Sequence, residues 1–491
     1  MQYCFGVKGD GGFHFQPPRN GTADRHRCNM NFREMNFNIS SSNGSSRPKS
    51  SKCRVIASGL GAERPNVLVV GSGGREHALA WKLSQELPPN HVFVGPGNGG
   101  TTLEPNLVTV SNLNPSKHQD VIRFCREKRI NFVMVGPEQP LVEGLVDSLE
   151  AAGITAFGPS AAAAKLEGSK AFMKNLCRKY NIPTAEYETF TSPNEAKAFI
   201  KAHGAPIVVK TSGLAAGKGV IVAQTVEEAY AAVDSMLIEK SFGESGSEIV
   251  VEEYLTGEEA SFFALIDGET CTPLEGAQDH KAVGDGDTGP NTGGMGSYSP
   301  APVLASDLQG AIMRDIVYPT ARGMAAEGTP FRGVLFAGIM VDSTGRPRLL
   351  EHNVRFGDPE CQSLMVRLQS SLLDALQGTL HGKAVTMSWD PQSSLTVILA
   401  AKGYPGTYQK GLVIKGLESV TEAKVFHSGT SLRDDGTVVS AGGRVLGVTA
   451  LGKDVAEAQA KSYAAVDRID FPDGFCRRDI GWRAIDRLHE N

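Results

Sequence analysis

Three polar residues that follow a short apolar run are the most informative feature of this 491-residue chain. Glu351 and Asn353 lie two residues apart, so in a strand their side chains point to the same face, and Arg355 comes next on that face. A carboxylate and an amide oxygen at one place suit Mg²⁺, which proteins usually hold with one or two such groups together with nucleotide phosphates. A solvated edge strand is the alternative, because short motifs also arise by chance. We predict that Glu351 and Asn353 bind a metal.

A glycine-rich segment with two lysines, residues 210–219, could contact the phosphates of such a nucleotide. Its pattern is G-x₃-G-K-G, which is not a Walker A loop, since no Ser or Thr follows Lys218 and strands are predicted at 207–210 and 220–223. A hairpin of this kind covers phosphates as a flap. Lys210 closes an apolar strand, where a merely solvated role is disfavoured. The residues that we expect at the phosphates are Lys170, Lys210, Gly217, Lys218 and Gly219.

The turn Gly71–His77 follows a predicted buried strand and opens a helix. It fails as a dinucleotide-binding fingerprint, because Glu76 stands where the third glycine should be and no acid closes the second strand. What remains is a glycine turn at a helix N-terminus, whose free N–H groups suit a phosphate. Arg75 could add a charge-assisted contact. The alternative is a tight turn with a solvated arginine.

Two further segments carry weaker signals. The strand end 252–255 could read an adenine edge through its backbone, and Glu259 could accept hydrogen bonds from ribose hydroxyls. Within Gln278–Lys281, Asp279 could hold a substrate ammonium and the two residues after it could contact phosphate. The glycine-rich stretch Gly284–Pro300 then predicts a long loop, and loops of that length are usually functional. Charged residues in turns are often only solvated, so each signal is weak alone.

The elements that position these residues fall into three regions. Apolar runs at 67–70, 91–94 and 132–135 end at Gly or Pro turns with helical sequence between them, which predicts βαβ units and a parallel sheet. Helices capped by Ser169, Ser192 and Thr225 and a helical stretch near 307–327 mark a second region. Its predicted strands are 207–210, 220–223, 249–251, 261–266, 334–341 and 348–353. The last region has strands near 395–401 and 443–449 and a helix capped by Asp454.

The first 62 residues differ from the rest, with nine Lys or Arg, three acids and a Ser-rich run. A basic, acid-poor leader without an apolar core predicts an organelle transit peptide, with a disordered cytosolic tail as the alternative. We expect the chloroplast stroma, with the mitochondrion as the alternative, because the Ser-rich part shows no clear amphipathic helix. Without this leader the chain has 40 basic and 51 acidic residues, a net charge near −11, which argues against a nucleic-acid-binding surface.

Composition bounds the remaining possibilities. With 41% hydrophobic and 21% charged residues the chain is ordinarily globular and long enough for several domains. No apolar run approaches the roughly 18 residues of a membrane span, so we expect no membrane partner. Five of the eight cysteines lie outside the leader without a C-x-x-C pair, which fits a reducing compartment and no zinc site.

Together these motifs resemble the ATP-grasp superfamily and, within it, the phosphoribosylamine–glycine ligase family, over about residues 66–490. The most specific segments are Gly73–Ala78, Gly213–Gly219, Gln278–Lys281, Gly289–Gly296 and Arg355–Glu360. One departure is His352, where an aromatic or aliphatic residue is expected, with its side chain turned away from the metal. The resemblance implies that glycine is joined to 5-phosphoribosylamine, with ATP split to ADP and phosphate through an acyl phosphate and with Mg²⁺ or Mn²⁺ as the metal.

The resemblance also implies a role for each motif. Arg355, Lys218 and Asp279 would be catalytic, and Glu351 and Asn353 would hold the metal. Besides the lysines and glycines above, ATP would be bound by Glu252, Glu253, Tyr254, Leu255 and Glu259. The ribosylamine and glycine would be bound by Gly73, Gly74, Arg75, Glu76, Gly97, Asn98, Glu138, Asp279, Lys281 and Arg355. The stretch Gly284–Gly296 would close over the site and exclude water.

The predicted fold is a multidomain α/β protein. We expect a transit peptide at 1–62, a parallel-sheet N-terminal domain at 63–165, an ATP-grasp domain pair at 166–380 and a small mixed α+β C-terminal domain at 381–491. The expected partners are the small-molecule substrates alone, with the chain a monomer or a weak homodimer. The alternatives are a biotin-carboxylase-like ligase, disfavoured because no Met-Lys-Met acceptor is present, and a nucleotide-binding scaffold, which would predict damaged metal or phosphate residues.

Overall fold

The structure is a computed structural model that describes residues 64–215 and 219–490. The expected leader at 1–62 and the expected phosphate contacts of Gly217 and Lys218 lie outside the described residues. Within the described residues, no helix is both long and apolar enough to cross a membrane.

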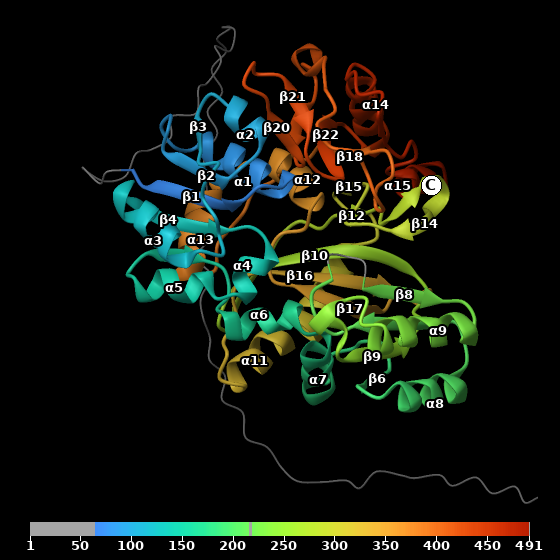
Figure 1. Cartoon of the computed structure of the whole chain (residues 1–491). Helices are drawn as coiled ribbons and strands as arrows, with labels where there is room; N and C mark the ends of the chain where they lie inside the picture. The colour runs from blue at the N-terminus through green and yellow to red at the C-terminus, as the bar shows by residue number, and fades with distance from the viewer. Residues whose placement is uncertain (1–63, 216–218, 491) are drawn as a thin grey trace, which may run out of the picture. The chain divides into compact units, whose positions relative to one another are not determined.

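The N-terminal region contains a five-stranded sheet in the order β3-β2-β1-β4-β5, and each neighbouring pair is parallel (Figure 1). The prediction of a parallel sheet is therefore confirmed. Its strands β1 to β5 are Asn66–Gly71, Val92–Pro96, Leu107–Thr109, Ile130–Val135 and Thr155–Phe157. Its helices α1 to α5 are Gly74–Ser84, Gly99–Leu103, His118–Glu127, Glu138–Val142 and Leu145–Ala151. The central strand β1 is buried along nearly its whole length, because helices cover both faces of such a sheet.

The second sheet is antiparallel with the order β6-β9-β7-β8. Its strands are β6 (Tyr187–Phe190), β7 (Ile207–Thr211), β8 (Val220–Ala223) and β9 (Ile249–Glu253), with helices α8 (Pro193–His203) and α9 (Val226–Val233). The side chains of Ser192 and Thr225 cap these two helices as predicted, each accepting a hydrogen bond from the backbone N–H three residues on. Both helices share one apolar core with the sheet, which leaves its other face for a ligand.

The third sheet is also antiparallel, with the order β11-β10-β16-β17. Its strands are β10 (Glu258–Asp267), β11 (Thr270–Pro273), β16 (Arg332–Val341) and β17 (Pro347–Asn353). The helices α6 (Ala161–Gly168), α7 (Lys170–Tyr180) and α10 (Ser306–Ile312) contact β17. The helical stretch expected near 307–327 is α10, a π-helical turn and α11 (Tyr318–Ala326). Because β17 packs against helices on one side, its other side is left to face the second sheet.

The C-terminal sheet has the order β12-β15-β18-β22-β19, with β23 paired to β18. Its strands are β12 (Gln278–Asp279), β15 (Gly296–Ser299), β18 (Ser393–Ala401), β19 (Lys424–His427), β22 (Arg444–Gly452) and β23 (Gly474–Phe475). The small pair β20 (Thr430–Leu432) and β21 (Val438–Ser440) and the helices α14 (Val455–Val466) and α15 (Trp482–Glu490) accompany it. Asp454 caps α14 as predicted.

The expectation of a continuous loop at Gly284–Pro300 is wrong. The stretch contains the hairpin strand β14 (Thr288–Asn291), paired with β13 (Ala282–Gly284), and then β15. β15 pairs with β18, with Ser297 opposite Thr396. Pairing with a strand about a hundred residues later stabilises this glycine-rich stretch, and its own composition carries no sign of that.

The helix α12 (Glu360–Arg367) joins three parts of the fold, and α13 (Leu372–Leu380) follows it. α12 packs against α1 of the N-terminal region and against β15, β18 and β22 of the C-terminal sheet. The segment 354–359, which links β17 to α12, therefore lies where all regions meet. Arg355 and the residues after it are held at this junction.

Candidate active site

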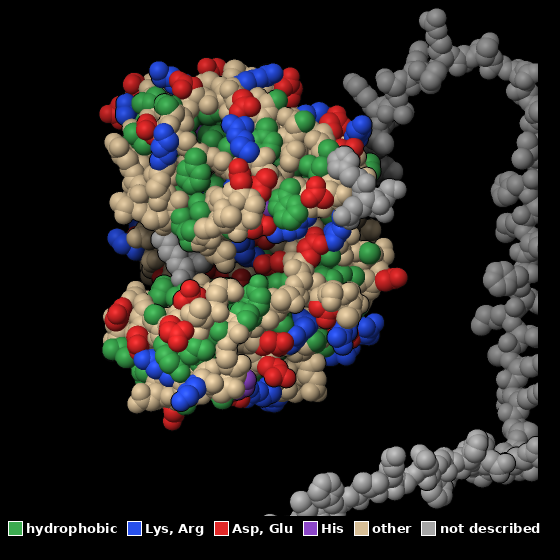
Figure 2. Space-filling model, turned by 90° about the vertical axis from the view of Figure 1, so that its right-hand side faces the viewer, with side chains coloured by type: hydrophobic (Ala, Val, Ile, Leu, Met, Phe, Trp, Pro, Cys, Tyr) green, Lys and Arg blue, Asp and Glu red, His purple; other side chains and the backbone are tan. Residues whose placement is uncertain are grey.

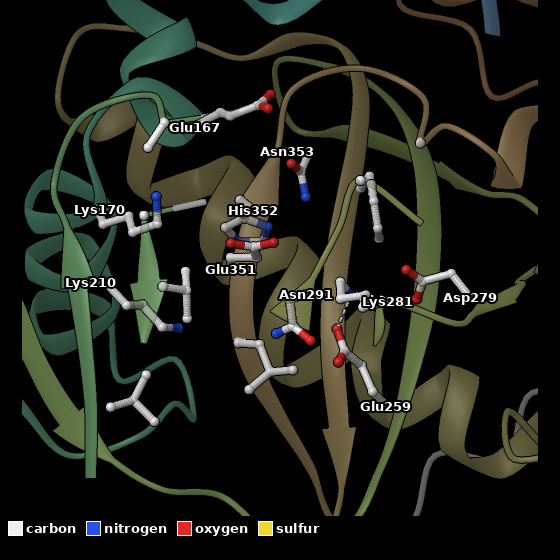
Figure 3. A pocket seen from close by; sticks show the side chains of 18 of the residues that line it. Glu167, Lys170, Lys210, Glu259, Asp279, Lys281, Asn291, Glu351, His352 and Asn353 are labelled. Atoms are coloured by element: carbon white, nitrogen blue, oxygen red, sulfur yellow. Dashed lines mark hydrogen bonds and ion pairs between the residues drawn. The ribbon is translucent and has the colours of Figure 1, made fainter. Parts of the chain in front are cut away.

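A cavity of about 790 Å³ lies between the second and third sheets and extends to the junction at 354–359. Acidic and basic side chains gather in the hollow that crosses the face seen in Figure 2. In Figure 3, lysines of α7 and β7 approach the cavity from one side, β17 runs through its centre, and Glu259, Asp279 and Lys281 lie on the other side. The cavity has the size and the mixture of convergent polar groups that are typical of ligand sites.

The predicted metal pair lies on β17, with Glu351 and Asn353 opposite Gly338 and Phe336 of β16. Both line the cavity, and their side chains lie one above the other (Figure 3). Burial opposes ionisation of Glu351, but the charges of Lys170, Lys210 and Lys281 outweigh it and lower its pKa. Among the described residues, no group of three or more His, Cys, Asp or Glu side chains could hold a metal ion by itself. One carboxylate and one amide fit an ion that takes its remaining ligands from phosphates and water.

The side chain of His352, the one departure from the family pattern, points away from the metal pair. Its Nε2 lies 3.0 Å from the hydroxyl of Thr320 on α11, and the residue is buried. Burial keeps the ring neutral and lowers its pKa to about 3. The strand alternation therefore places this histidine against the helix layer, as expected from its position between Glu351 and Asn353.

Three buried charges form a chain beside the end of the cavity where the sequence predicts the nucleotide, which we call the nucleotide end. Glu252 of β9 pairs with Lys210 of β7 through one carboxylate oxygen, and its other oxygen lies 2.5 Å from Lys174 of α7. Burial disfavours the charge of Lys210, but Glu252 and Glu351 raise its pKa, so it stays protonated. Burial lowers the pKa of Lys174 in spite of Glu252. The three groups together carry one net positive charge when all are ionised.

The predicted adenosine segment 252–255 is the end of β9 and the turn after it, and all four residues line the cavity. Glu253 pairs with Arg348 at 2.7 Å, while Tyr254 is 39% exposed. Glu259 on β10 pairs with Lys281, whose ammonium also lies 3.4 Å from Asp279. The structure thus places the residues predicted for adenosine along one cavity, although Glu252 itself is paired with two lysines.

Arg355, which the sequence predicts at the second substrate, is held between two carboxylates. Its guanidinium lies 2.7 Å from Glu167 of α6 and 3.2 Å from Glu138 of α4. Burial opposes ionisation of Glu138, but Arg355 and Arg75 lower its pKa to about 2. Arg75 lies 2.6 Å from Glu76 and donates to the carbonyl of Phe356 at 3.0 Å. Arg75 of the N-terminal region and Arg355, which follows the third sheet, therefore meet at one anionic wall.

The glycine turn at the start of α1 differs from the expected phosphate loop. The N–H of Gly73 donates to Glu76 at 2.6 Å, and the N–H of Arg75 donates to Asp358 at 3.3 Å. Carboxylates of the chain itself thus occupy donors that the sequence offered to a ligand. Several predicted substrate contacts do not line the cavity, namely Gly73, Gly74, Glu76, Gly97 and Asn98. The side-chain oxygen of Asn98 caps α2 instead, and its amide donates to the carbonyl of His427 at 2.7 Å.

Sequence reasoning missed five residues that line or support this site: Glu167, Lys174, Asp358, Glu360 and Arg444. Glu360 lines the cavity and accepts a hydrogen bond from Ser261 at 3.1 Å. Burial, with the nearby charge of Asp279, raises its pKa to about 7. Glu167 shares a helix face with Ala163 and Ala164, and Lys174 lies between Ala171 and Cys177 on its own helix, which was the available signal, since a charge on an apolar face needs a partner.

A cavity with Lys210 on one antiparallel sheet, Lys170 on the helix beside it and a Glu–Asn pair on the strand that faces them is the arrangement of an ATP-grasp enzyme. The family profiles agree with the geometry. The chain belongs to the phosphoribosylglycinamide synthetase family: its N-domain profile matches residues 65–167, its ATP-grasp (A) domain profile residues 168–361 and its C-domain profile residues 394–483.

Named relatives support the assignment. The chain is 56% identical over 420 residues to the chloroplastic phosphoribosylamine–glycine ligase of Arabidopsis thaliana, covering 84% of this chain and 79% of that one. It is 54% identical to the enzyme of that name from Escherichia coli K12, covering 86% of this chain and 99% of that one. A crystal structure of phosphoribosylamine–glycine ligase from Thermotoga maritima aligns with a TM-score of 0.74 at 32% identity, covering 84% and 99% of the two chains. A biotin carboxylase of Campylobacter jejuni shares the fold, with a TM-score of 0.63 at 14% identity and coverage of 83% and 92%.

Proposed function

We propose that the protein ligates glycine to 5-phosphoribosylamine with the cleavage of ATP to ADP and phosphate, as the family assignment implies. The observation that carries the proposal is the position of Glu351 and Asn353 beside Lys170 and Lys210 (Figure 3), in the cavity that Arg355 also lines. Such an arrangement would let a nucleotide phosphate and a carboxylate substrate meet at one metal ion. The reaction forms glycinamide ribonucleotide, the second step of purine synthesis.

In the first step the glycine carboxylate attacks the terminal phosphorus of ATP and forms glycyl phosphate, with ADP as the leaving group. Phosphoryl transfer depends mainly on positioning and on charge neutralisation. Lys170 and Lys210, together with Lys218 and the glycines of the flap, hold the phosphates. Mg²⁺ or Mn²⁺, held by Glu351 and Asn353, would neutralise negative charge on the transferring phosphate. Segment 252–255 and Glu259 hold the adenosine.

In the second step the amine of phosphoribosylamine attacks the glycyl carbonyl and phosphate leaves. Arg355 orients the acyl phosphate, Asp279 binds the glycine ammonium, and Lys281 neutralises the anion beside it. Glu360 is the proton acceptor for the attacking amine, because a carboxyl group with a pKa near 7 can take up a proton at neutral pH. The Gly284–Gly296 segment covers the reacting atoms and excludes water from the acyl phosphate. The walls near Arg75 and Glu138, with the α1 turn and the Gly97-Asn98 turn behind them, hold the ribosylamine.

The proposal extends to the setting of the enzyme. The basic leader and the chloroplastic relative support import into the chloroplast stroma, with the leader at 1–62 removed. We propose the domain limits 63–165, 166–380 and 381–491 for the mature part and a monomer or weak homodimer as its assembly. Plastid import of a fusion of residues 1–62 with a fluorescent protein, and the elution volume of the protein on gel filtration, test these two points.

The test of the function is ADP release by the full chain with Mg-ATP, glycine and freshly generated phosphoribosylamine, each omitted in turn. Release that needs all three supports the ligase. Release that ignores glycine would assign another carboxylate substrate to the same fold. ATP binding without any release would favour a nucleotide-binding scaffold.

A further inference from the structure

One arginine of the C-terminal sheet reaches the cavity and has no role in the reaction described above. Arg444 begins β22, and its side chain lines the cavity with 20% of its surface exposed. Its Nη1 donates to the carbonyls of Gly293 at 2.6 Å and Gly294 at 3.4 Å, and it also contacts the carbonyl of Asp358. All of these contacts use a single nitrogen of the guanidinium.

The other donors of this guanidinium are not engaged. Among the described residues, Nη2 and Nε of Arg444 have no hydrogen-bond partner. They lie over the Cα of Gly293, where a Cβ would stand 3.2 Å from Nη2 and 3.4 Å from Nε. A guanidinium presents five N–H groups in a planar fork, so a bidentate edge is left for an anion.

The charge of Arg444 is also the least compensated at this end of the cavity. Arg355 and Arg75 each have a carboxylate within 2.7 Å, and Lys281 is paired with Glu259. The carboxylate of Asp358 lies 3.6 Å from Nη1 of Arg444, beyond hydrogen-bond distance. Asp358 itself is occupied, since it accepts from the Arg75 N–H and from Gln362 at 2.8 Å.

The position of Arg444 favours the second substrate over ATP as its ligand. Arg75 and Arg355 both donate to the carbonyl of Phe356, and Arg444 contacts the carbonyl of Asp358 two residues further on. Arg444 therefore lies beside Arg75 and Arg355 along the segment 356–358, which follows β17 and its metal pair. The donors of the α1 turn, expected at first to hold a phosphate, are taken by carboxylates. A sugar phosphate needs another cation.

We propose that Arg444 binds the 5-phosphate of the sugar-phosphate substrate and so makes the enzyme selective for a phosphorylated ribosylamine. The inference rests on the proposed function for the identity of the substrate. The C-terminal region then contributes directly to the site, and an anion on the free edge of Arg444 would lie beside Gly293. Arg444 would then both recognise the phosphate and hold the covering segment at Gly293 and Gly294 in place.

The competing role is structural. Arg444 could serve only to anchor the segment at Gly293, whose N–H donates to the hydroxyl of Tyr404 at 3.1 Å while its carbonyl accepts from Arg444. Tyr404 is also part of the C-terminal region and lines the cavity. Tyr404→Phe removes the other anchor of Gly293 without changing charge, and it is the matched control for Arg444→Met.

The experiment compares wild type, Arg444→Met, Arg444→Lys and Tyr404→Phe as full chains. Isothermal titration with ribose 5-phosphate and with ribose measures the preference for the phosphate without turnover. We expect wild type to prefer ribose 5-phosphate and Arg444→Met to lose about 10- to 100-fold of that preference, the effect of losing a hydrogen bond between charged groups. Arg444→Lys should retain part of it, because a point charge remains without the fork. Tyr404→Phe should keep the full preference.

Steady-state kinetics give a second reading. Arg444→Met should raise the KM for phosphoribosylamine by a similar factor and leave the KM values for ATP and glycine within about twofold. An unchanged preference for ribose 5-phosphate in Arg444→Met, or an equal loss in Tyr404→Phe, would overturn the proposal. Failure of wild type to ligate glycine would refute the proposed function alone, since the preference for ribose 5-phosphate over ribose still tests the subsite.

Discussion

Replacing Lys174 by Met should weaken ATP binding although the side chain does not line the cavity. Lys174 lies behind Glu252, 2.5 Å from its carboxylate, and donates to the hydroxyl of Thr184 at 2.7 Å. Lys174, Glu252 and Lys210 together carry one net positive charge, and the substitution brings the net charge of this group to zero. Lys210 then faces the phosphates with its charge fully balanced by Glu252.

The magnitude follows from Coulomb's law. For a unit of phosphate charge ~10 Å away and an effective dielectric constant of about 20, one lost charge costs roughly 1.7 kcal/mol. That corresponds to about a 20-fold rise in the Kd for Mg-ATP. Because the group is buried, the effect should persist in raised salt.

Folding should be affected much less. Burial lowers the pKa of Lys174, so below its ordinary pKa the charged lysine costs stability, and Met removes that cost. Glu252 loses one partner but keeps Lys210, which offsets the gain. Glu252→Gln is different, because it leaves two buried ammonium groups together and should destabilise the protein by about 3–5 kcal/mol.

The assay is calorimetric titration of Mg-ATP in the absence of glycine, with Lys174→Arg as the control that keeps the charge. We expect the Arg variant to bind within about threefold of wild type. A Met variant with the Kd of wild type would refute the argument that the net charge of this buried group governs ATP affinity. Equal losses in the Met and Arg variants would assign the effect to packing instead.

Three further predictions follow from the site and its surroundings. Glu351→Gln should abolish ADP release at limiting Mg²⁺ while leaving the Tm within about 2 °C, and an unchanged rate would refute the metal assignment. Glu360 must be ionised to accept a proton, so kcat should rise with pH through about 7, and Glu360→Gln should lose that limb; a limb retained in this variant would exclude the role. Glu104 pairs with His77 and Lys424, and these partners lower its pKa to about 2 although burial opposes this. The ionised carboxylate therefore stabilises the fold above its ordinary pKa, and this contribution is lost as the pH falls toward 2. From pH 5 to pH 3 the free energy of unfolding, measured with denaturant, should therefore fall by about 2 kcal/mol more in wild type than in Glu104→Gln, and parallel curves would contradict it.

Features that depend on neighbours in the chain could be predicted from the sequence. The caps at Ser192, Thr225 and Asp454 are hydrogen bonds to a backbone three residues away, and the structure has all three. The shared face of Glu351 and Asn353 follows from the strand period of two residues. The parallel sheet follows from alternating strands and helices, because a parallel crossover needs a helix between strands.

Features that depend on distant pairing could not be predicted. Arg355 meets Glu167 across 188 residues, and Arg75 meets Asp358 across 283. No local pattern distinguishes a carboxylate that will neutralise an arginine from one that stays in water. The glycine turn at Gly73 shows the consequence, since its composition offered free N–H groups and the fold supplied carboxylates for them.

The pairing of cations also explains which of them are available to ligands. A buried ammonium or guanidinium without a counter-charge is costly, and most of the described cations of the cavity have a carboxylate as a close partner. Among those described residues, Lys170 and Arg444 have no carboxylate within hydrogen-bond distance. Lys170 lies on α7 and Arg444 on β22, so the two least closely paired cations of the cavity come from different sheets and helices, one for each phosphorylated substrate of the proposed reaction. A ligase that must bind two phosphorylated substrates would keep these two cations without a hydrogen-bonded carboxylate.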